Sequence, residues 1–214
     1  MKRSSYALGA MAAVVLTSLG LAACGGGDDN DSTSVSSADQ GQITQAIQAL
    51  ATGSDPSACT QFATQKFVDQ TNGPASGQAA VQACEKDYRS GQGAVADSIE
   101  VTNVQVDGSA ATASAKATGN IFDGQTIELS LVKEDGTWKL DVFKGFSDFD
   151  KTALINSFKG QLQNEGGSSA AVNCVAQNLE KQSDQTLEKS FTESSDNTLD
   201  QQVFAPCSKY FKQG

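Results

Sequence analysis

The fold is decided by residues 101–142, VTNVQVDGSAATASAKATGNIFDGQTIELSLVKEDGTWKLDV. Three Asp-Gly pairs interrupt this stretch at nearly regular spacing, namely Asp107-Gly108, Asp123-Gly124 and Asp135-Gly136. An Asp-Gly pair between two segments of alternating polarity is a strong signal for a β-hairpin. The stretch therefore predicts an antiparallel meander of about four strands, the first of which begins near Ile99.

Apolar and polar residues alternate along these strands, so each strand is expected to have one buried face. The first strand changes parity, because Ile99 and Val101 share one face whereas Val104 and Val106 share the other. This change predicts a bulge near residues 102–103. The buried faces of the other three strands carry Ala111, Ala113, Ala115, Ala117, Ile127, Leu129, Leu131, Trp138, Leu140 and Val142.

Residues before the strands show the spacing of amphipathic helices. Three helices are predicted, over about residues 40–53, 56–73 and 76–91, with glycine or proline at each end point. Because the meander needs cover on one face, these helices are expected to pack against it, which is an α+β arrangement.

Helical spacing returns after the strands. Apolar stripes predict four further helices within residues 147–214, which we separate from an α+β domain at residues 40–146. About 68 residues of helix form a small core, so a disulfide staple is expected there. The stripe residues are Leu154, Ile155, Phe158, Leu162, Ala171, Cys174, Val175, Leu179, Leu187, Phe191, Leu199, Val203, Phe204, Cys207 and Phe211.

The first residues have the order of a secretory signal, with basic Lys2 and Arg3, an apolar run over residues 6–21, and then Ala22-Ala23-Cys24. Leu21-Ala22-Ala23-Cys24 resembles the lipobox of bacterial lipoproteins. The resemblance implies cleavage after residue 23 and acyl chains, such as palmitate, on Cys24. A membrane-spanning helix and an ordinary cleaved signal are the alternatives, but the apolar run is short for a span and neither alternative needs the cysteine.

The lipobox resemblance implies a location at the bacterial cell membrane, on the extracytoplasmic side, with the lipid on Cys24 as the membrane contact. Residues 24–39 are rich in Gly, Asp and Ser and are expected to form a flexible tether. Asp28, Asp29 and Asp31 in this tether could contact calcium, but no loop with EF-hand spacing follows. A solvated acidic linker is therefore the preferred interpretation, and no metal site or cofactor is predicted.

The composition excludes several classes of function. Loss of residues 1–23 removes Lys2 and Arg3 and no acidic residue, so the formal net charge goes from −10 to −12. Such an acidic chain without a basic patch is not expected to bind nucleic acid. The sequence contains no histidine, which excludes Ser-His-Asp and Cys-His catalytic sets within the chain.

Four cysteines remain besides Cys24, and an even number in an exported protein indicates disulfide bonds. Four cysteines allow three pairings, and locality favours Cys59 with Cys84 and Cys174 with Cys207. The alternative is a set of buried free thiols, which an oxidising compartment disfavours.

Residues 57–143 contain a series of short motifs, namely Ala58-Cys59, Phe67-Val68, Ala83-Cys84, the run at 104–108 and the run LVKEDGTWKL at 131–140. In these motifs the segment resembles the nuclear-transport-factor-2-like (cystatin-like cone) lipoproteins of actinobacteria and relatives. It implies a cone of curved antiparallel sheet covered by helices, with a cavity between them. The family's short strand between the second and third helices has little room in residues 69–75 of this sequence.

The cone fold hosts enzymes and non-catalytic modules alike, so its chemistry must be judged from residues. A binding cavity for a small apolar ligand would be lined by Phe62, Phe67, Tyr88 and Trp138. The preferred interpretation is that the small residues of the second strand let the helices approach the sheet closely and that Trp138 fills the core. An isomerase-like or dehydratase-like enzyme would need an inward carboxylate beside a donor such as Tyr88.

The acidic residues that can be placed on the strands, Glu128 and Asp141, alternate onto the polar face. We therefore expect no catalytic residues, and a non-catalytic protein with a binding or scaffolding role. In the scaffolding case, an envelope protein would cover the small polar face of Thr112, Ser114, Lys116 and Thr118, although a solvated face is the preferred interpretation of these residues. The expected core includes Phe62, Phe67, Leu129, Leu131, Trp138 and Leu140.

Overall fold

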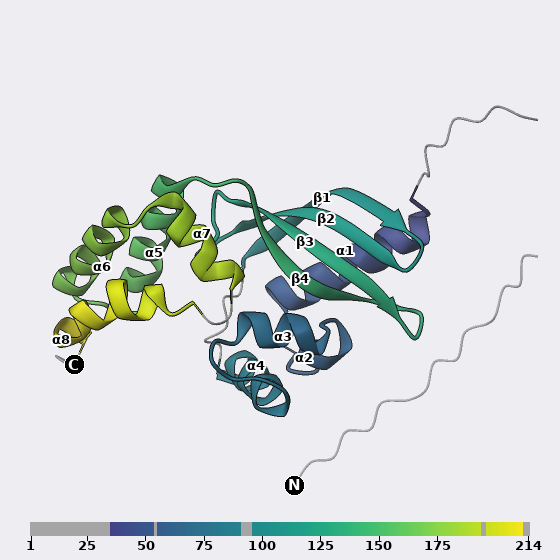
Figure 1. Ribbon diagram of the computed structural model, residues 1–214, viewed down its shortest axis with the longest axis horizontal. Coiled ribbons are helices and arrows are strands. Elements are labelled where there is room, and N and C mark those ends of the chain that lie inside the picture. Colours follow the sequence, from purple (N-terminus) through teal and green to yellow (C-terminus); the bar gives the residue numbers. More distant parts are fainter. Residues whose placement is uncertain (1–34, 54, 91–95, 194–195, 212–214) are drawn as a thin grey trace, which may run out of the picture. The chain divides into compact units, whose positions relative to one another are not determined.

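A computed structural model describes residues 35–53, 55–90, 96–193 and 196–211. The predicted signal peptide, Cys24 and residues 28–31 lie outside this part of the chain. The described part is α+β, with a curved four-stranded antiparallel sheet and helices before and after it (Figure 1). Among the described residues, no helix has the length and apolarity needed to cross a lipid bilayer.

The sheet is the predicted meander, with strand order β1-β2-β3-β4. The strands are β1 (Ser98–Asp107), β2 (Ala110–Thr118), β3 (Thr126–Glu134) and β4 (Thr137–Asp148). Asp135 and Gly136 both have positive φ, 50° and 81°, as the tight turn between β3 and β4 requires. The predicted bulge is confirmed, because the β1–β2 register shifts between Thr102 and Gln105.

The middle connection is not the tight turn that Asp123-Gly124 predicts. Residues 119–125 form a longer loop between β2 and β3. Its Phe122 reaches an aromatic cluster, and the Asn120 side chain accepts a hydrogen bond from the Phe122 backbone N–H. Packing of Phe122 therefore explains why the chain makes a wider connection here.

Helix α1 (Ser37–Thr52) packs on one face of the sheet through Ile43, Ala46 and Ile47. Ser36 caps the helix by accepting a hydrogen bond from the Asp39 backbone N–H. The helix therefore begins inside the segment predicted as tether, and the boundary at residue 39 is wrong by about one turn. A capping serine followed by an acidic residue in the first turn explains the earlier start.

The single helix predicted over residues 56–73 is also wrong. The structure has α2 (Ala58–Gln61) and α3 (Gln65–Thr71), followed by α4 (Gln78–Ser90). Between α2 and α3 the chain pairs with β4, since Leu140 N–H donates to the Phe62 carbonyl and Thr64 N–H donates to the Leu140 carbonyl. These bonds to β4 replace helical hydrogen bonds, and Thr64 then caps α3.

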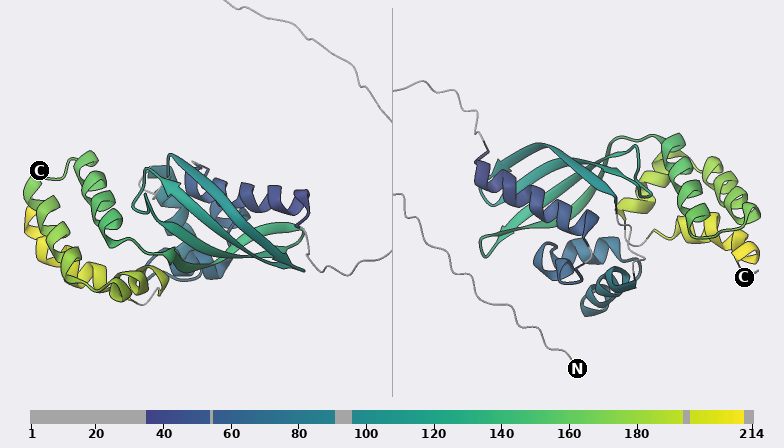
Figure 2. Two further views of the ribbon diagram at one scale, coloured as in Figure 1. Left: turned by 90° about the horizontal axis from the view of Figure 1, so that it is seen from above. Right: turned by 180° about the vertical axis from the view of Figure 1, so that it is seen from behind.

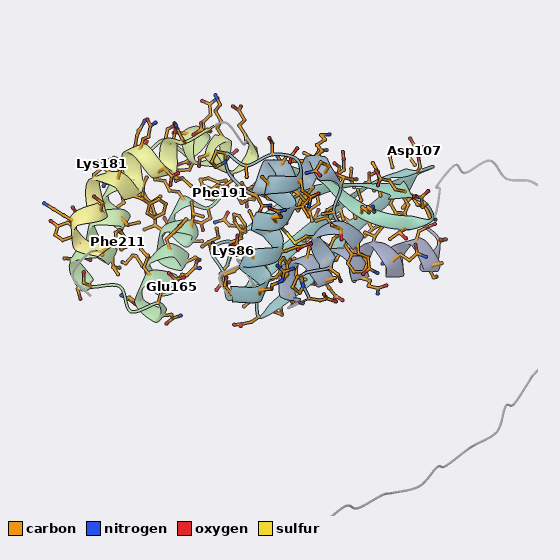
Figure 3. The ribbon with its side chains drawn as sticks, turned by 90° about the horizontal axis from the view of Figure 1, so that it is seen from below. Lys86, Asp107, Glu165, Lys181, Phe191 and Phe211 are labelled. Carbon is orange, nitrogen blue, oxygen red and sulfur yellow. A yellow bond between two sulfur atoms is a disulfide. The ribbon has the colours of Figure 1, made fainter. Side chains whose placement is uncertain are left out.

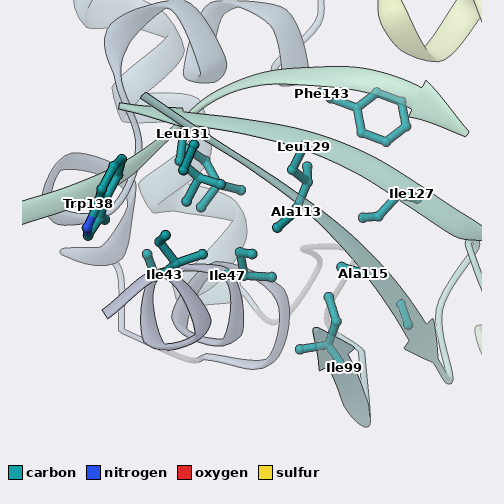
Figure 4. Packing of buried hydrophobic residues seen from close by; sticks show 14 of the residues in the cluster. Ile43, Ile47, Ile99, Ala113, Ala115, Ile127, Leu129, Leu131, Trp138 and Phe143 are labelled. Atoms are coloured by element: carbon teal, nitrogen blue, oxygen red, sulfur yellow. The ribbon is translucent and has the colours of Figure 1, made fainter. Parts of the chain in front are cut away.

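The core lies between α1 and the sheet, where Ile43 and Ile47 point toward the strands (Figure 4). Four of the six predicted core residues are at most 3% exposed, namely Leu129, Leu131, Trp138 and Leu140. Phe62 and Phe67 are only partly buried and pack against the edge of this cluster. Phe67 lies on α3, and Phe62 lies just before this helix. Because α3 contacts β4 at one edge of the sheet, these rings do not reach the centre of the sheet.

The polar sheet face is less uniform than predicted. Lys116 and Thr118 are exposed and Thr112 is half-buried, but Ser114 is buried. Its hydroxyl donates to the Glu128 carboxylate and accepts from the Asn103 side chain. The bulge places Asn103 beside Ser114, which the alternation alone did not predict.

The helices that follow the sheet are α5 (Lys151–Asn164), α6 (Ser169–Lys181) and α7 (Asp184–Thr192). A π-helical turn η1 (Leu199–Phe204), a 3-10 turn η2 (Ala205–Cys207) and α8 (Ser208–Phe211) complete the described chain (Figure 2). Their own apolar cluster includes Leu154, Leu179, Leu187 and Val203. Buried Gln125 joins this region to the sheet, because its amide donates to the Asp150 carbonyl and accepts from the Asp150 backbone N–H.

Both local disulfide bonds are present. Cys59–Cys84 joins α2 to α4, and Cys174–Cys207 joins α6 to η2. Each bond closes a loop within its own region, with sequence separations of 25 and 33 residues.

Candidate functional site

A cavity of about 430 Å³ lies between the helices before the sheet and the face of the sheet that carries α1. This volume lies within the range of about 300–1,000 Å³ that small-molecule sites occupy. Its wall draws on α1, α3, α4, all four strands and α7. Because these elements are distant in sequence, the cavity exists only in the folded chain.

The floor of the cavity is apolar and comes from the sheet. Ile99, Ile127, Leu129 and Leu140 lie there, and Ala117 on β2 contributes only a methyl group. A larger side chain at Ala117 would project into the same space, so the small residues of β2 help to leave the cavity open. Burial of apolar ligand surface against this floor would supply most of the binding free energy.

Aromatic rings close the side toward the C-terminal helices. Phe122, Phe143, Phe146 and Phe191 form a cluster, with ring centroids of Phe122 and Phe191 5.4 Å apart. Figure 3 labels Phe191, which packs against both the sheet core and the cluster of the C-terminal helices. Helix α7 therefore contributes directly to the cavity wall through Phe191.

Gln70 on α3 fixes this wall. Its amide nitrogen donates to the carbonyls of Phe143 and Thr192, at 2.8 and 2.7 Å, and its oxygen accepts from Phe143 N–H. One side chain thus connects α3, β4 and the end of α7. No local sequence pattern indicated this role for Gln70.

Tyr88 lines the cavity from α4, but its hydroxyl donates to the Leu50 carbonyl of α1. Burial raises the pKa of Tyr88 to about 12. No carboxylate of the described residues is hydrogen-bonded to this hydroxyl. The arrangement that an isomerase-like site needs, a carboxylate beside an available tyrosine hydroxyl, therefore does not occur at Tyr88 in the described part of the chain.

The structure places two of the four predicted lining residues in the wall. Phe67 and Tyr88 line the cavity, whereas Phe62 and Trp138 are not among its described lining residues. Trp138 is 1% exposed, and its indole N–H donates to the Asp39 carboxylate at 2.8 Å. Trp138 therefore fills the core beside the start of α1, which is the preferred of the two interpretations of this ring, and it does not line the cavity.

Asp39 is a residue that the sequence did not single out. Its carboxylate accepts from Lys133 Nζ at 2.8 Å as well as from Trp138 and Ser36. These hydrogen bonds, with that of Lys133 the strongest, hold the pKa of Asp39 well below its usual range. Asp39 joins α1 to β3 and β4 and is a structural contact, away from the cavity lining.

The charged groups of the wall are acidic. Asp87 on α4, Glu193 after α7 and Asp196 line the cavity, and no lysine or arginine is among the described lining residues. Thr198 donates backbone and side-chain hydrogen bonds that hold the pKa of Asp196 below its ordinary value. The described residues contain no group of three or more Cys, Asp or Glu side chains placed to hold a metal ion.

No protein-family model matches the chain, and no curated protein matches it. Among solved structures, the chain is similar to the structure of TsrD from Streptomyces laurentii, at 18% sequence identity and a TM-score of 0.30. The match covers 58% of this chain and 97% of the TsrD chain.

Proposed function

We propose that this protein is a non-catalytic, lipid-anchored binding protein of the bacterial cell surface. In this proposal, a cone-shaped nuclear-transport-factor-2-like domain holds a small, largely apolar molecule between its helices and sheet. The lipid on Cys24 keeps the domain at the extracytoplasmic side of the membrane. The single observation that carries the binding function is the apolar cavity of about 430 Å³.

Two features support binding over the other candidate roles. The cavity is lined on one side by aliphatic side chains of the sheet and on another by Phe67 and Phe191. The polar side chains of the wall come from the helices and the loops rather than from the strands, as in sites that bury an apolar body and contact one polar end. The engaged hydroxyl of Tyr88 supports a non-catalytic site, because a donor already bound to Leu50 is not presented to a ligand.

The binding proposal can be tested with a neutral apolar probe. All described helices and strands lie in one compact unit, residues 33–214, so this unit can be produced without the preceding segment. We expect the fluorescence of N-phenyl-1-naphthylamine to increase on binding. Ala51→Phe, which adds a ring at the cavity wall, should abolish the increase, while Ala49→Phe on the same helix should retain it.

Circular dichroism shows whether each variant is folded. Ser190→Leu, on the opposite wall, is the second blocking variant if Ala51→Phe does not fold. An equal signal from Ala49→Phe and a folded blocking variant, or no signal from the unaltered chain, would contradict binding in this cavity.

The anchoring part needs the full chain in a bacterial host. Cys24→Ala should leave an uncleaved or soluble precursor, whereas the unaltered chain should fractionate with membranes. Membrane fractionation and mature mass that do not change in Cys24→Ala would overturn the anchor without bearing on the cavity.

A further inference from the structure

The side-chain amides that line the cavity from α3 and the residue after it already donate their hydrogens within the protein. Both amide hydrogens of Gln70 go to backbone carbonyls, and those of Asn72 go to the Val68 carbonyl and the Thr71 hydroxyl. A ligand would have to displace these internal bonds in order to receive a hydrogen bond from either amide.

The wall hydroxyls are used in the same way. Thr71 donates to the Phe67 carbonyl, Tyr88 to the Leu50 carbonyl and Ser190 to the Leu187 carbonyl. A hydroxyl has a single hydrogen to donate, so these three groups offer a ligand only acceptor lone pairs.

The charged acceptors that line the cavity are carboxylates. Within the described part of the chain, no group donates a hydrogen bond to the Asp87 side chain. Asp196 accepts from Thr198, and the charge of Lys189 also acts on it. Glu193 is ion-paired with Lys189 at 3.3 Å, so it is partly neutralised. Asp87 and Asp196 are therefore the charged groups with remaining capacity to accept.

We infer that the ligand carries a protonated amine on an apolar body, an inference that rests on the proposed function. An ammonium group has three donors and a positive charge, and it can pair with the carboxylate of Asp87 or of Asp196 at the wall while its apolar part contacts the sheet floor. A carboxylate or phosphate group would find no basic side chain among the described lining residues and would be repelled by the two aspartates. The net charge of the chain, −10, also favours a cationic ligand over an anionic one.

The test compares three probes with the same chain length, decylamine, decanol and decanoate, by calorimetric titration of residues 33–214 at neutral pH. We expect decylamine to bind about tenfold or more tightly than decanoate, since one charge-assisted hydrogen bond contributes about 1.4 kcal/mol or more, a factor of ten. Asp87→Asn and Asp196→Asn should each weaken decylamine several-fold and leave decanol unchanged.

The control is Asp107→Asn, which removes the same charge from an exposed residue at the end of β1 that does not line the cavity (Figure 3 labels Asp107). Equal weakening of decylamine by Asp107→Asn and Asp87→Asn would show that net charge alone is responsible, and would overturn the inference. Decanoate binding as tightly as decylamine would also overturn it, while leaving the binding cavity in place. Failure of all three probes would contradict the proposed function itself.

Discussion

The sheet region and the C-terminal helices are stabilised in different ways. The sheet region, from α1 to β4, has four paired strands. Its core forms because apolar and polar residues alternate along these strands. The C-terminal region ends in three short elements, η1, η2 and α8, of six, three and four residues. Helices of this length are not stable by themselves, so their position depends on packing and on the disulfide bond.

The two disulfide bonds differ accordingly in what surrounds them. Cys207 is fully buried and belongs to the same apolar cluster as Leu179 and Val203. Cys59 and Cys84 belong to a separate small cluster with Val68 and Val81, beside the main core of the sheet. A bond of similar loop length can therefore support a central core in one region and a peripheral one in the other.

The largest effect is expected from truncation of the sheet core. Trp138→Ala should lower the free energy of unfolding by about 3–5 kcal/mol, because it removes a buried aromatic side chain and leaves a cavity. Denaturant titration measures the change. Phe211→Ala on α8, where the ring is 44% exposed, is the control and should change stability by less than about 0.5 kcal/mol. Similar losses in the two variants would contradict the assigned core.

Removal of each disulfide bond should lower hydrogen-exchange protection in a different part of the chain. The chain-entropy model gives about 3–4 kcal/mol for either loop, so total stability alone does not distinguish them. We expect Cys174→Ala with Cys207→Ala to remove hydrogen-exchange protection throughout α6 to α8. Cys59→Ala with Cys84→Ala should affect α2 and α4 and leave the strands protected. Loss of strand protection in the second pair would show that the bridge supports the main core.

Gln70→Ala tests the contact between the two regions. The substitution leaves the carbonyls of Phe143 and Thr192 and the Phe143 N–H without their partner, which should cost about 1–3 kcal/mol. Gln82→Ala, at an exposed position of α4, is the matched control. Exchange protection of α7 should fall selectively in Gln70→Ala, and an unchanged α7 would exclude Gln70 as the link.

The smallest effect is expected on the loss of stability at low pH, through Asp39. Its folded pKa is lowered, so its contribution to stability is present above the ordinary value near 3.8 and is lost as pH falls below that value. Asp39→Asn should therefore show a shallower loss of stability below about pH 4 than the unaltered chain. Asp107→Asn serves as the control on the same sheet. If stability falls with pH equally in the unaltered chain and in Asp39→Asn, the proposed contribution of Asp39 to acid stability is contradicted.

The sequence by itself determined the meander, the bulge in β1 and most of the helices after the sheet. Two of the three Asp-Gly pairs, a period of two and a change of parity act between neighbouring residues, and they leave few alternatives for the backbone. The burial of Leu129, Leu131, Trp138 and Leu140 followed from the same pattern. Both local cysteine pairings were also expected from spacing.

Only the tertiary structure decided where the cavity lies and what lines it. Phe191 and Asp196 come from beyond the sheet, and Gln70 acts through backbone groups of β4 and α7. The break between α2 and α3 likewise depends on pairing with Leu140, far along the chain. Periodicity reports which side of an element is apolar, but it carries no information on which distant backbone will satisfy a polar group or which distant ring will close a wall. For that physical reason the fold class could be predicted from the sequence, whereas only Phe67 and Tyr88 of the cavity wall could.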